Sequence, residues 1–130
     1  MYEKVTHDIK ITVQPGFLDD QSRPDDGYFV WAYTITIENL SDVAVTLKTR
    51  YWRITDSAGK VQEVRGAGVV GEQPTLKPGD SFEYTSGAPL ATPSGFMVGS
   101  YQMETDLGQA INVDIPLFSL DSPYAPRQLH

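Results

Sequence analysis

Three closely spaced glycines form the pattern with the clearest chemical meaning in this sequence. Gly66, Gly68 and Gly71 have the spacing G-x-G-x-x-G, which in nucleotide-binding folds closes a strand-to-helix turn and directs backbone N–H groups at a pyrophosphate. That arrangement needs a helix directly after the glycines. Pro74 and Pro78 disfavour one, because proline lacks an N–H and restricts the residue before it. The motif therefore stands outside its usual structural setting.

Two interpretations of these glycines remain open. In the first, they allow positive φ angles where the chain crosses from one sheet to another. In the second, they form a nest of backbone N–H groups that binds pyrophosphate or a nucleotide without a helix, with Arg65 or Lys77 close by. The second interpretation makes Gly66, Gly68 and Gly71 the candidate ligand-binding residues.

Paired carboxylates are the next candidates for chemistry. Asp19-Asp20 and Asp25-Asp26 lie in a polar loop with Pro24 and Gly27, and their oxygens could hold a hard divalent cation weakly. Neighbouring loop aspartates are also common solvated turn formers, and neither an EF-hand spacing nor a tight histidine site is present. No metal site is therefore assigned, and cation binding at these four aspartates stays an alternative.

Catalysis would need a base beside a reacting group. The two histidines are His7, which the alternation of its segment places on an inward strand face, and His130, the last residue. Cysteine is absent, so cysteine nucleophiles and thiolate metal sites are excluded. We therefore expect a protein that is not an enzyme and uses no cofactor.

A short cationic stripe is a further candidate site. Lys48, Arg50 and Trp52 share one face if their strand is regular. Two cations beside an aromatic ring could bind a phosphate or the acidic segment of a partner. The same pattern is also typical of a solvated strand face, and a suspected β-bulge leaves the shared face open.

Composition limits the class of protein. The 130 residues fit a single domain. Seventeen acidic and 10 basic side chains give a net charge of −7, which repels nucleic acid and anionic membranes. The sequence shows no apolar run that could span a bilayer and no secretion signal. We expect a cytoplasmic protein that neither binds nucleic acid nor inserts into a membrane.

The elements that must position these residues are strands. Apolar and polar residues alternate with a period of two, turn residues recur between the alternating segments, and no helical period is found. This pattern predicts an all-β fold, an antiparallel immunoglobulin or fibronectin type III-like β-sandwich of about seven strands, with a barrel as the alternative. The expected strands cover residues 5–13, 28–40, 43–54, 61–64, 81–85, 97–103 and 111–115.

Irregularities and domain limits can also be predicted. The apolar phase changes after Leu47, which indicates a β-bulge near Thr49 to Tyr51. The last two segments form a closing hairpin, and Pro116 marks an edge or a bulge because it cannot donate to a ladder. We expect one domain over residues 1–118 and a mobile C-terminal tail over residues 119–130.

Several motifs together resemble the bacterial ApaG family, also called CorD. The motifs are the glycine run through Pro74, the turn Leu76-x-Pro-Gly79, and the segments 51–56, 82–87, 90–103 and 115–118. The resemblance covers nearly the whole chain and implies a fibronectin type III-like sandwich. It also implies a link to cobalt resistance and magnesium efflux, a genomic setting near a diadenosine tetraphosphate hydrolase and an rRNA dimethyltransferase, and protein contacts like those of similar eukaryotic domains. It supplies no catalytic residue.

Two functional hypotheses follow. The first is a non-enzymatic binding module that acts through contacts with an unknown protein partner in divalent-cation homeostasis. The second is a small-ligand sensor that binds pyrophosphate or a nucleotide at residues 66–71.

Overall fold

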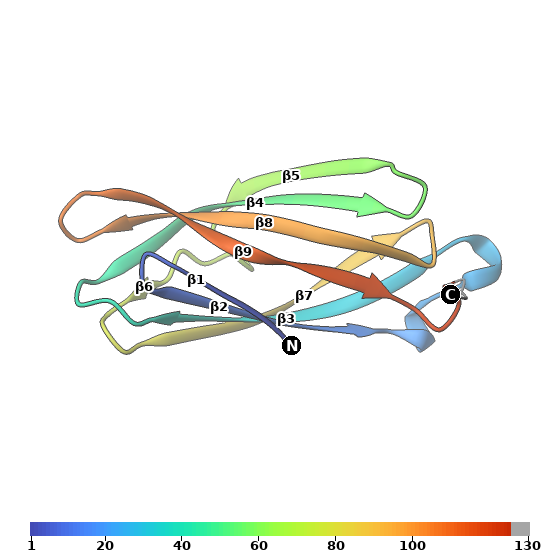
Figure 1. Cartoon of the computed structure of the whole chain (residues 1–130), viewed down its shortest axis with the longest axis horizontal. Coiled ribbons are helices and arrows are strands. Elements are labelled where there is room, and N and C mark those ends of the chain that lie inside the picture. The colour runs from blue at the N-terminus through green and yellow to red at the C-terminus, as the bar shows by residue number, and fades with distance from the viewer. Residues whose placement is uncertain (126–130) are drawn as a thin grey trace, which may run out of the picture.

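The chain folds as two antiparallel β-sheets packed face to face, and a computed structural model describes residues 1–125 (Figure 1). One sheet has the strand order β1-β2-β3-β7 and the other β5-β4-β8-β9, with β6 beside β4. Two short 3-10 turns, η1 and η2, lie between β2 and β3. The bounds are β1 (Tyr2–Thr6), β2 (Ile9–Phe17), η1 (Asp19–Gln21), η2 (Pro24–Asp26), β3 (Phe29–Asn39), β4 (Val45–Asp56), β5 (Val61–Ala67), β6 (Thr75–Leu76), β7 (Ser81–Leu90), β8 (Ser94–Thr105) and β9 (Ala110–Asp121).

This architecture confirms the predicted fibronectin type III-like sandwich. The described residues form nine strands instead of about seven, because the first predicted strand is a hairpin and β6 has two residues. The barrel alternative is wrong, because within residues 1–125 β5 pairs only with β4, and β7 pairs only with β3.

The core is built on β3, as its alternation predicts. Trp31, Tyr33 and Ile35 are buried on its inward face. The ring of Tyr33 meets that of Trp52 at 5.4 Å, and Phe118 packs against both rings. Removing each such side chain from water stabilises the fold by about 1.5–3 kcal/mol, so strands from both sheets are joined through this aromatic cluster.

The first predicted strand is corrected to the hairpin β1–β2. His7 and Asp8 have φ angles of 51° and 60° and form its two-residue turn, with Thr6 opposite Ile9. The turn was missed because it lacks the glycine or asparagine that usually marks positive φ, although His and Asp are enriched there. His7 is consequently exposed at the hairpin tip, not on an inward strand face.

Both predicted strand irregularities are confirmed. The pairing of β4 with β8 shifts between Leu47 and Thr49, so Lys48 is the extra residue of a bulge just before the predicted position. The pairing of β8 with β9 shifts between Met97 and Gly99, opposite Pro116. The closing hairpin of β8 and β9 is confirmed as well.

The predicted C-terminal boundary needs correction. Residues 119–121, assigned to a mobile tail, continue β9, where Ser119 pairs with Phe96 and Leu120 is fully buried. Tyr124 then packs its ring against Phe17 at 6.1 Å. The apolar side chains after Pro116 thus keep the chain on the core. The rest of the predicted tail, residues 126–130 with His130, lies outside the described residues.

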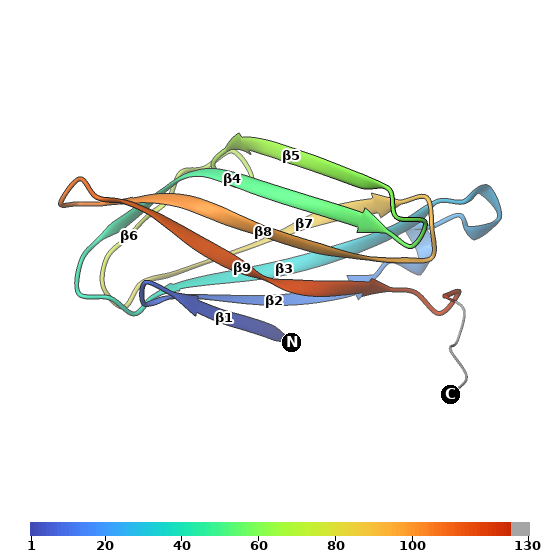
Figure 2. The ribbon, with the colours of Figure 1, turned by 45° about the horizontal axis from the view of Figure 1, so that its top comes forward.

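One side of the sandwich is covered and the other is open (Figure 2). The edge of β9 is covered by β1, since Lys4 forms an ion pair with Asp114 at 3.2 Å and the Thr6 hydroxyl accepts from the Asp114 N–H. On the opposite side β5 and β7 are the outer strands of their sheets. The glycine run lies in the loop from β5 to β6, two strands that both pair with β4. The chain reaches the other sheet after β6, through residues 77–80.

Candidate functional site

The glycine run forms a tight turn at the end of β5. Val69 and Glu72 exchange both backbone hydrogen bonds, at 2.8 and 2.9 Å, and the two residues between them, Val70 and Gly71, have φ angles of 44° and 81°. Two positive φ angles are typical of a type I′ turn. Val69 is 1% exposed and anchors the turn on the core.

The geometry supports a backbone role for these glycines but corrects the crossing interpretation. Gly68 and Gly71 have positive φ angles and Gly66 does not, and the loop joins β5 to β6 beside the same strand, β4. Gly68, at a φ of 63°, donates its N–H to Lys48 O, so this amide and those of Val69 and Glu72 are already engaged. The short strand β6 follows instead of a helix. A phosphate nest needs consecutive free N–H groups, and only Val70 and Gly71 offer them within residues 68–72. Pyrophosphate binding stays a prediction.

Arg50 lies beneath this turn, between the two sheets. It pairs with Gly66 across β4 and β5, two residues from buried Trp52, and therefore shares the inward face of Trp52. Its Nη1 donates to Ala67 O at 3.2 Å and to Gly68 O at 2.9 Å. The bulge leaves Lys48 exposed. The strand is therefore not regular here, which was the condition for a stripe of Lys48, Arg50 and Trp52 on one face, and only Arg50 and Trp52 share the inward face.

Three tyrosines lie close to Arg50 within the sandwich. The hydroxyls of Tyr84 and Tyr101 share a hydrogen bond of 2.5 Å. Burial raises the pKa of Tyr33, Tyr84 and Tyr101, and the charge of Arg50 lowers each pKa in part. The tyrosines therefore remain protonated at neutral pH and can act as hydrogen-bond donors.

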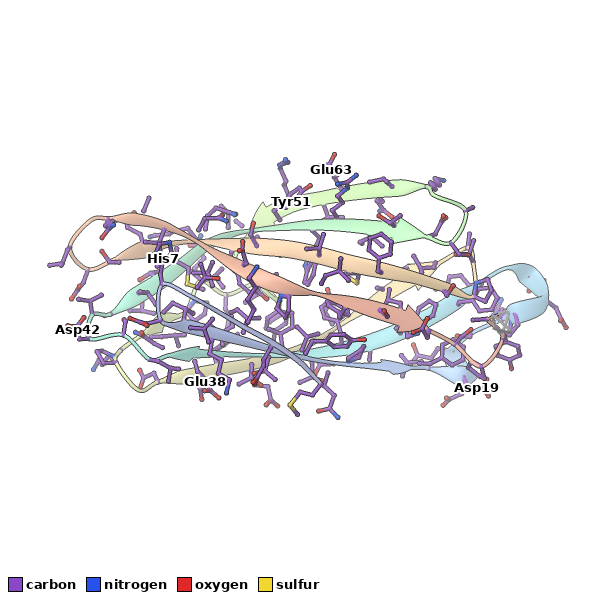
Figure 3. All side chains as sticks on the ribbon, in the orientation of Figure 1. His7, Asp19, Glu38, Asp42, Tyr51 and Glu63 are labelled. Carbon is purple, nitrogen blue, oxygen red and sulfur yellow. The ribbon has the colours of Figure 1, made fainter. Side chains whose placement is uncertain are left out.

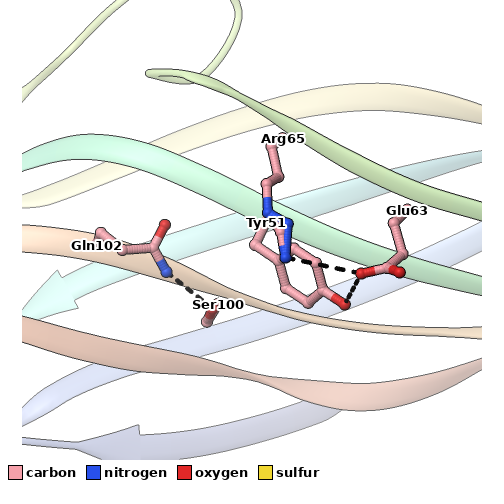
Figure 4. A network of polar contacts seen from close by, with 5 residues as sticks. All are labelled: Tyr51, Glu63, Arg65, Ser100 and Gln102. Carbon is pink, nitrogen blue, oxygen red and sulfur yellow. Dashed lines mark hydrogen bonds and ion pairs between the residues drawn. The ribbon is translucent and has the colours of Figure 1, made fainter.

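The outer face of the second sheet carries a polar network (Figure 4). The Tyr51 hydroxyl donates to Glu63 Oε2 at 2.7 Å, and Arg65 forms an ion pair with the same oxygen at 3.7 Å. The guanidinium of Arg65 also lies over the Tyr51 ring, 4.5 Å from its centroid. The hydrogen bond to Glu63 raises the pKa of Tyr51. Tyr51 is thus held by two residues of β5, by Glu63 through a hydrogen bond and by Arg65 through contact with its ring.

A shallow groove runs beside this network. It has a volume of about 530 Å³, and Thr49, Tyr51, Arg65, Ser100 and Gln102 are among its lining residues. Gln102 is fixed in it, because its Oε1 accepts from the Thr49 hydroxyl at 2.7 Å and its Nε2 donates to Asn112 Oδ1 at 2.8 Å. The groove lies across β4, β5 and β8, and its polar side chains are held in place before any partner arrives.

The structure does not gather the four aspartates of the alternative cation site into one group. Asp19 and Asp20 lie on η1, and Asp25 and Asp26 on η2. Within residues 1–125, no three His, Asp or Glu side chains form a group that could hold a metal ion. His7 and Asp19 lie at opposite ends of the molecule (Figure 3).

Sequence reasoning missed both the network and the position of Arg50. Tyr51, Glu63 and Arg65 meet only through the register of β4 and β5, in which Tyr51 faces Arg65. The available signal was the alternation in β5, which puts Glu63 and Arg65 on one face. In the part of the chain that the structure describes, no helix has the length and apolar character to span a membrane.

Comparison with known proteins agrees with the motifs. A family model described as ApaG domain matches residues 19–105. Protein ApaG of Parvibaculum lavamentivorans is 60% identical over 130 residues, and Protein ApaG of Agrobacterium fabrum is 59% identical over 130 residues, each covering 100% of both chains. A crystal structure of an ApaA protein from Bordetella pertussis is 44% identical with a TM-score of 0.87, covering 91% of this chain and 96% of that chain. The chain therefore belongs to the ApaG family.

Proposed function

We propose that this chain is a non-enzymatic interaction module that binds a protein partner through the outer face of β4, β5 and β8. The observation that carries the proposal is the exposed network of Tyr51, Glu63 and Arg65 beside the groove. Tyrosine and arginine are the residue types that most often dominate binding at protein interfaces. The proposed role of the module in divalent-cation homeostasis rests on the resemblance to the ApaG family. A cytoplasmic location stays an expectation from the sequence.

Two features make this face suitable for a partner. Tyr51 and Arg65 are already held in place, so less side-chain freedom is lost on binding. Apolar side chains continue the same face, because Thr55 pairs with both Val61 and Phe96, and these are 42% and 39% exposed. Protein interfaces are enriched in tyrosine and arginine and bury apolar surface within a polar rim, so Val61 and Phe96 would add apolar area beside Tyr51 and Arg65.

The test compares two double variants. Tyr51→Ala with Arg65→Ala removes the network, and Thr34→Ala with Thr85→Ala removes an exposed hydrogen-bonded pair from the outer face of the other sheet. Each variant is expressed in a strain that lacks the gene, and cobalt tolerance and co-purified proteins are measured. We expect the first variant to lose the partner and tolerance, while the control keeps both. Equal recovery by both variants, or normal tolerance without the gene, would contradict the proposal.

The alternative function is a sensor that binds pyrophosphate or a nucleotide at Gly66, Gly68 and Gly71. It is supported by the N–H groups of Val70 and Gly71, which have no acceptor among residues 1–125. Titration of the labelled protein with ATP and diadenosine tetraphosphate tests it through the amide signals of the three glycines. Unmoved signals at millimolar ligand would remove this alternative.

A further inference from the structure

A second cavity lies between the two sheets, beneath the glycine turn. It has a volume of about 320 Å³, and its walls come from β3, β4, β7, the end of β5 and the loop that follows β5. Tyr33, Tyr84 and Ser86 contribute hydroxyl groups, and Trp52, Val69 and Val70 contribute apolar surface. Among the lining residues, Arg50 is the one that carries a charge, and the remaining two are Ala67 and Gly71.

The guanidinium of Arg50 is fixed but only partly used. Nη1 donates to Ala67 O and Gly68 O, whereas Nε and Nη2 have no acceptor, and Arg50 has no ion-pair partner, within residues 1–125. Every fully buried side-chain nitrogen in that range has a hydrogen-bond partner, so these two nitrogens are reached by solvent. Together they form one edge of the planar group, with two parallel N–H bonds.

Gly66 provides the space for this guanidinium. A Cβ at residue 66 would lie 2.7 Å from Arg50 Nη1 and 2.9 Å from Nη2, both closer than a Cβ approaches a neighbouring atom. An alanine there would displace the end of the Arg50 side chain while leaving the strand backbone in place. Gly66, the first glycine of the motif, therefore leaves room for the guanidinium of Arg50 to lie against β5.

The chemistry of the cavity selects the class of ligand. A guanidinium edge matches the two oxygens of a carboxylate and binds them with two charge-assisted hydrogen bonds. The single positive charge balances one carboxylate, and protonated tyrosine and serine hydroxyls can donate to its remaining lone pairs. Trp52, Val69 and Val70 offer apolar contact to the carbon skeleton of the acid.

We propose that this cavity binds the carboxylate group of an organic acid, with the Nε and Nη2 edge of Arg50 as its anchor. Arg50 and Gly66 also line the outer groove, but the proposed partner face rests on the side chains of Tyr51, Glu63 and Arg65.

The test is a titration of the ¹⁵N-labelled protein with sodium benzoate, acetate, a capped peptide containing one glutamate, and inorganic phosphate. We expect saturable shifts of the Arg50 Nε–H signal and of the Gly68 and Gly71 amides with the carboxylates. Tighter binding of benzoate than of the peptide would identify a free acid as the source of the carboxylate, and the reverse order would identify a protein side chain. Tighter binding of phosphate would overturn the assignment.

Variants separate binding from a purely structural role of Arg50. Arg50→Gln and Gly66→Ala should each weaken carboxylate binding at least about tenfold. Lys48→Gln makes the same charge change at the exposed bulge and should leave binding unchanged. If Arg50→Gln does not fold, Gly66→Ala still gives the answer, because it retains the arginine. The proposal is overturned if neither benzoate nor the glutamate peptide gives a saturable shift at about 20 mM, or if both variants bind as the original chain does.

Discussion

Substitution of Gly68 by alanine tests the structural role of the glycine motif. A Cβ at this position would lie 2.2 Å from Glu72 O, so the turn has to open, and the φ of 63° is unfavourable for alanine. The conformational penalty is about 1 kcal/mol, and two backbone hydrogen bonds between Val69 and Glu72 contribute about 1 kcal/mol each. We therefore expect Gly68→Ala to lose about 3 kcal/mol of unfolding free energy.

The matched control is Gly71→Ala. This glycine has a φ of 81°, but no atom lies within 4 Å of an added Cβ, so only the conformational penalty of about 1 kcal/mol applies. Urea unfolding, followed by tryptophan fluorescence, measures the unfolding free energy of both variants. In a thermal melt, the melting temperature of Gly68→Ala should fall by about 10 °C. Equal losses in the two variants, or a loss below about 1 kcal/mol for Gly68→Ala, would refute the steric reasoning.

Three further predictions concern stability. Asn39→Ala should cost about 3 kcal/mol in urea unfolding, because the buried Asn39 amide donates to Val43 O and Leu76 O; a loss below about 1 kcal/mol would contradict this role. Val70→Gly should raise stability by about 1 kcal/mol in thermal melts, since a β-branched residue is strained at a φ of 44°, and an unchanged melt would count against strain. The pKa of Tyr84 is raised above its usual 10.0, so the neutral form is favoured in the folded state, and stability is full below about pH 10 and is lost as pH rises further. Above pH 10, Tyr84→Phe should reduce the slope of unfolding free energy against pH by up to about 1.4 kcal/mol per pH unit. An unchanged slope would mean that other groups cause the loss of stability.

The strands could be predicted from the sequence wherever one face of the strand is buried, because apolar and polar residues then alternate. The alternation of Trp31, Tyr33 and Ile35 defines β3, and the phase change after Leu47 located the bulge within one or two residues. The turn at His7 and Asp8 was missed because its residues reach positive φ without glycine. Burial of Leu120, which the sequence pattern left in a tail, depends on how β9 packs on the core.

The candidate sites were harder to predict, because each depends on register. A single extra residue, Lys48, determines that Arg50 points between the sheets rather than beside Lys48 on the surface. Tyr51, Glu63 and Arg65 come together only because β4 and β5 pair with Tyr51 opposite Arg65. The glycine motif was visible at once, yet its spacing alone did not distinguish a turn from a nest. The hydrogen bond from Gly68 N to Lys48 O shows that this amide is engaged within the turn, while pyrophosphate binding stays a prediction.

Photo-cross-linking in cells tests the proposed partner face most directly. A benzoylphenylalanine replaces either Arg53, exposed on the face of Tyr51, or Thr85, exposed on the outer face of the other sheet. We predict that position 53 forms a cross-link to one reproducible protein and that position 85 does not. A cross-link from position 85 alone, or from neither position, would contradict the assignment of the partner face to β4, β5 and β8.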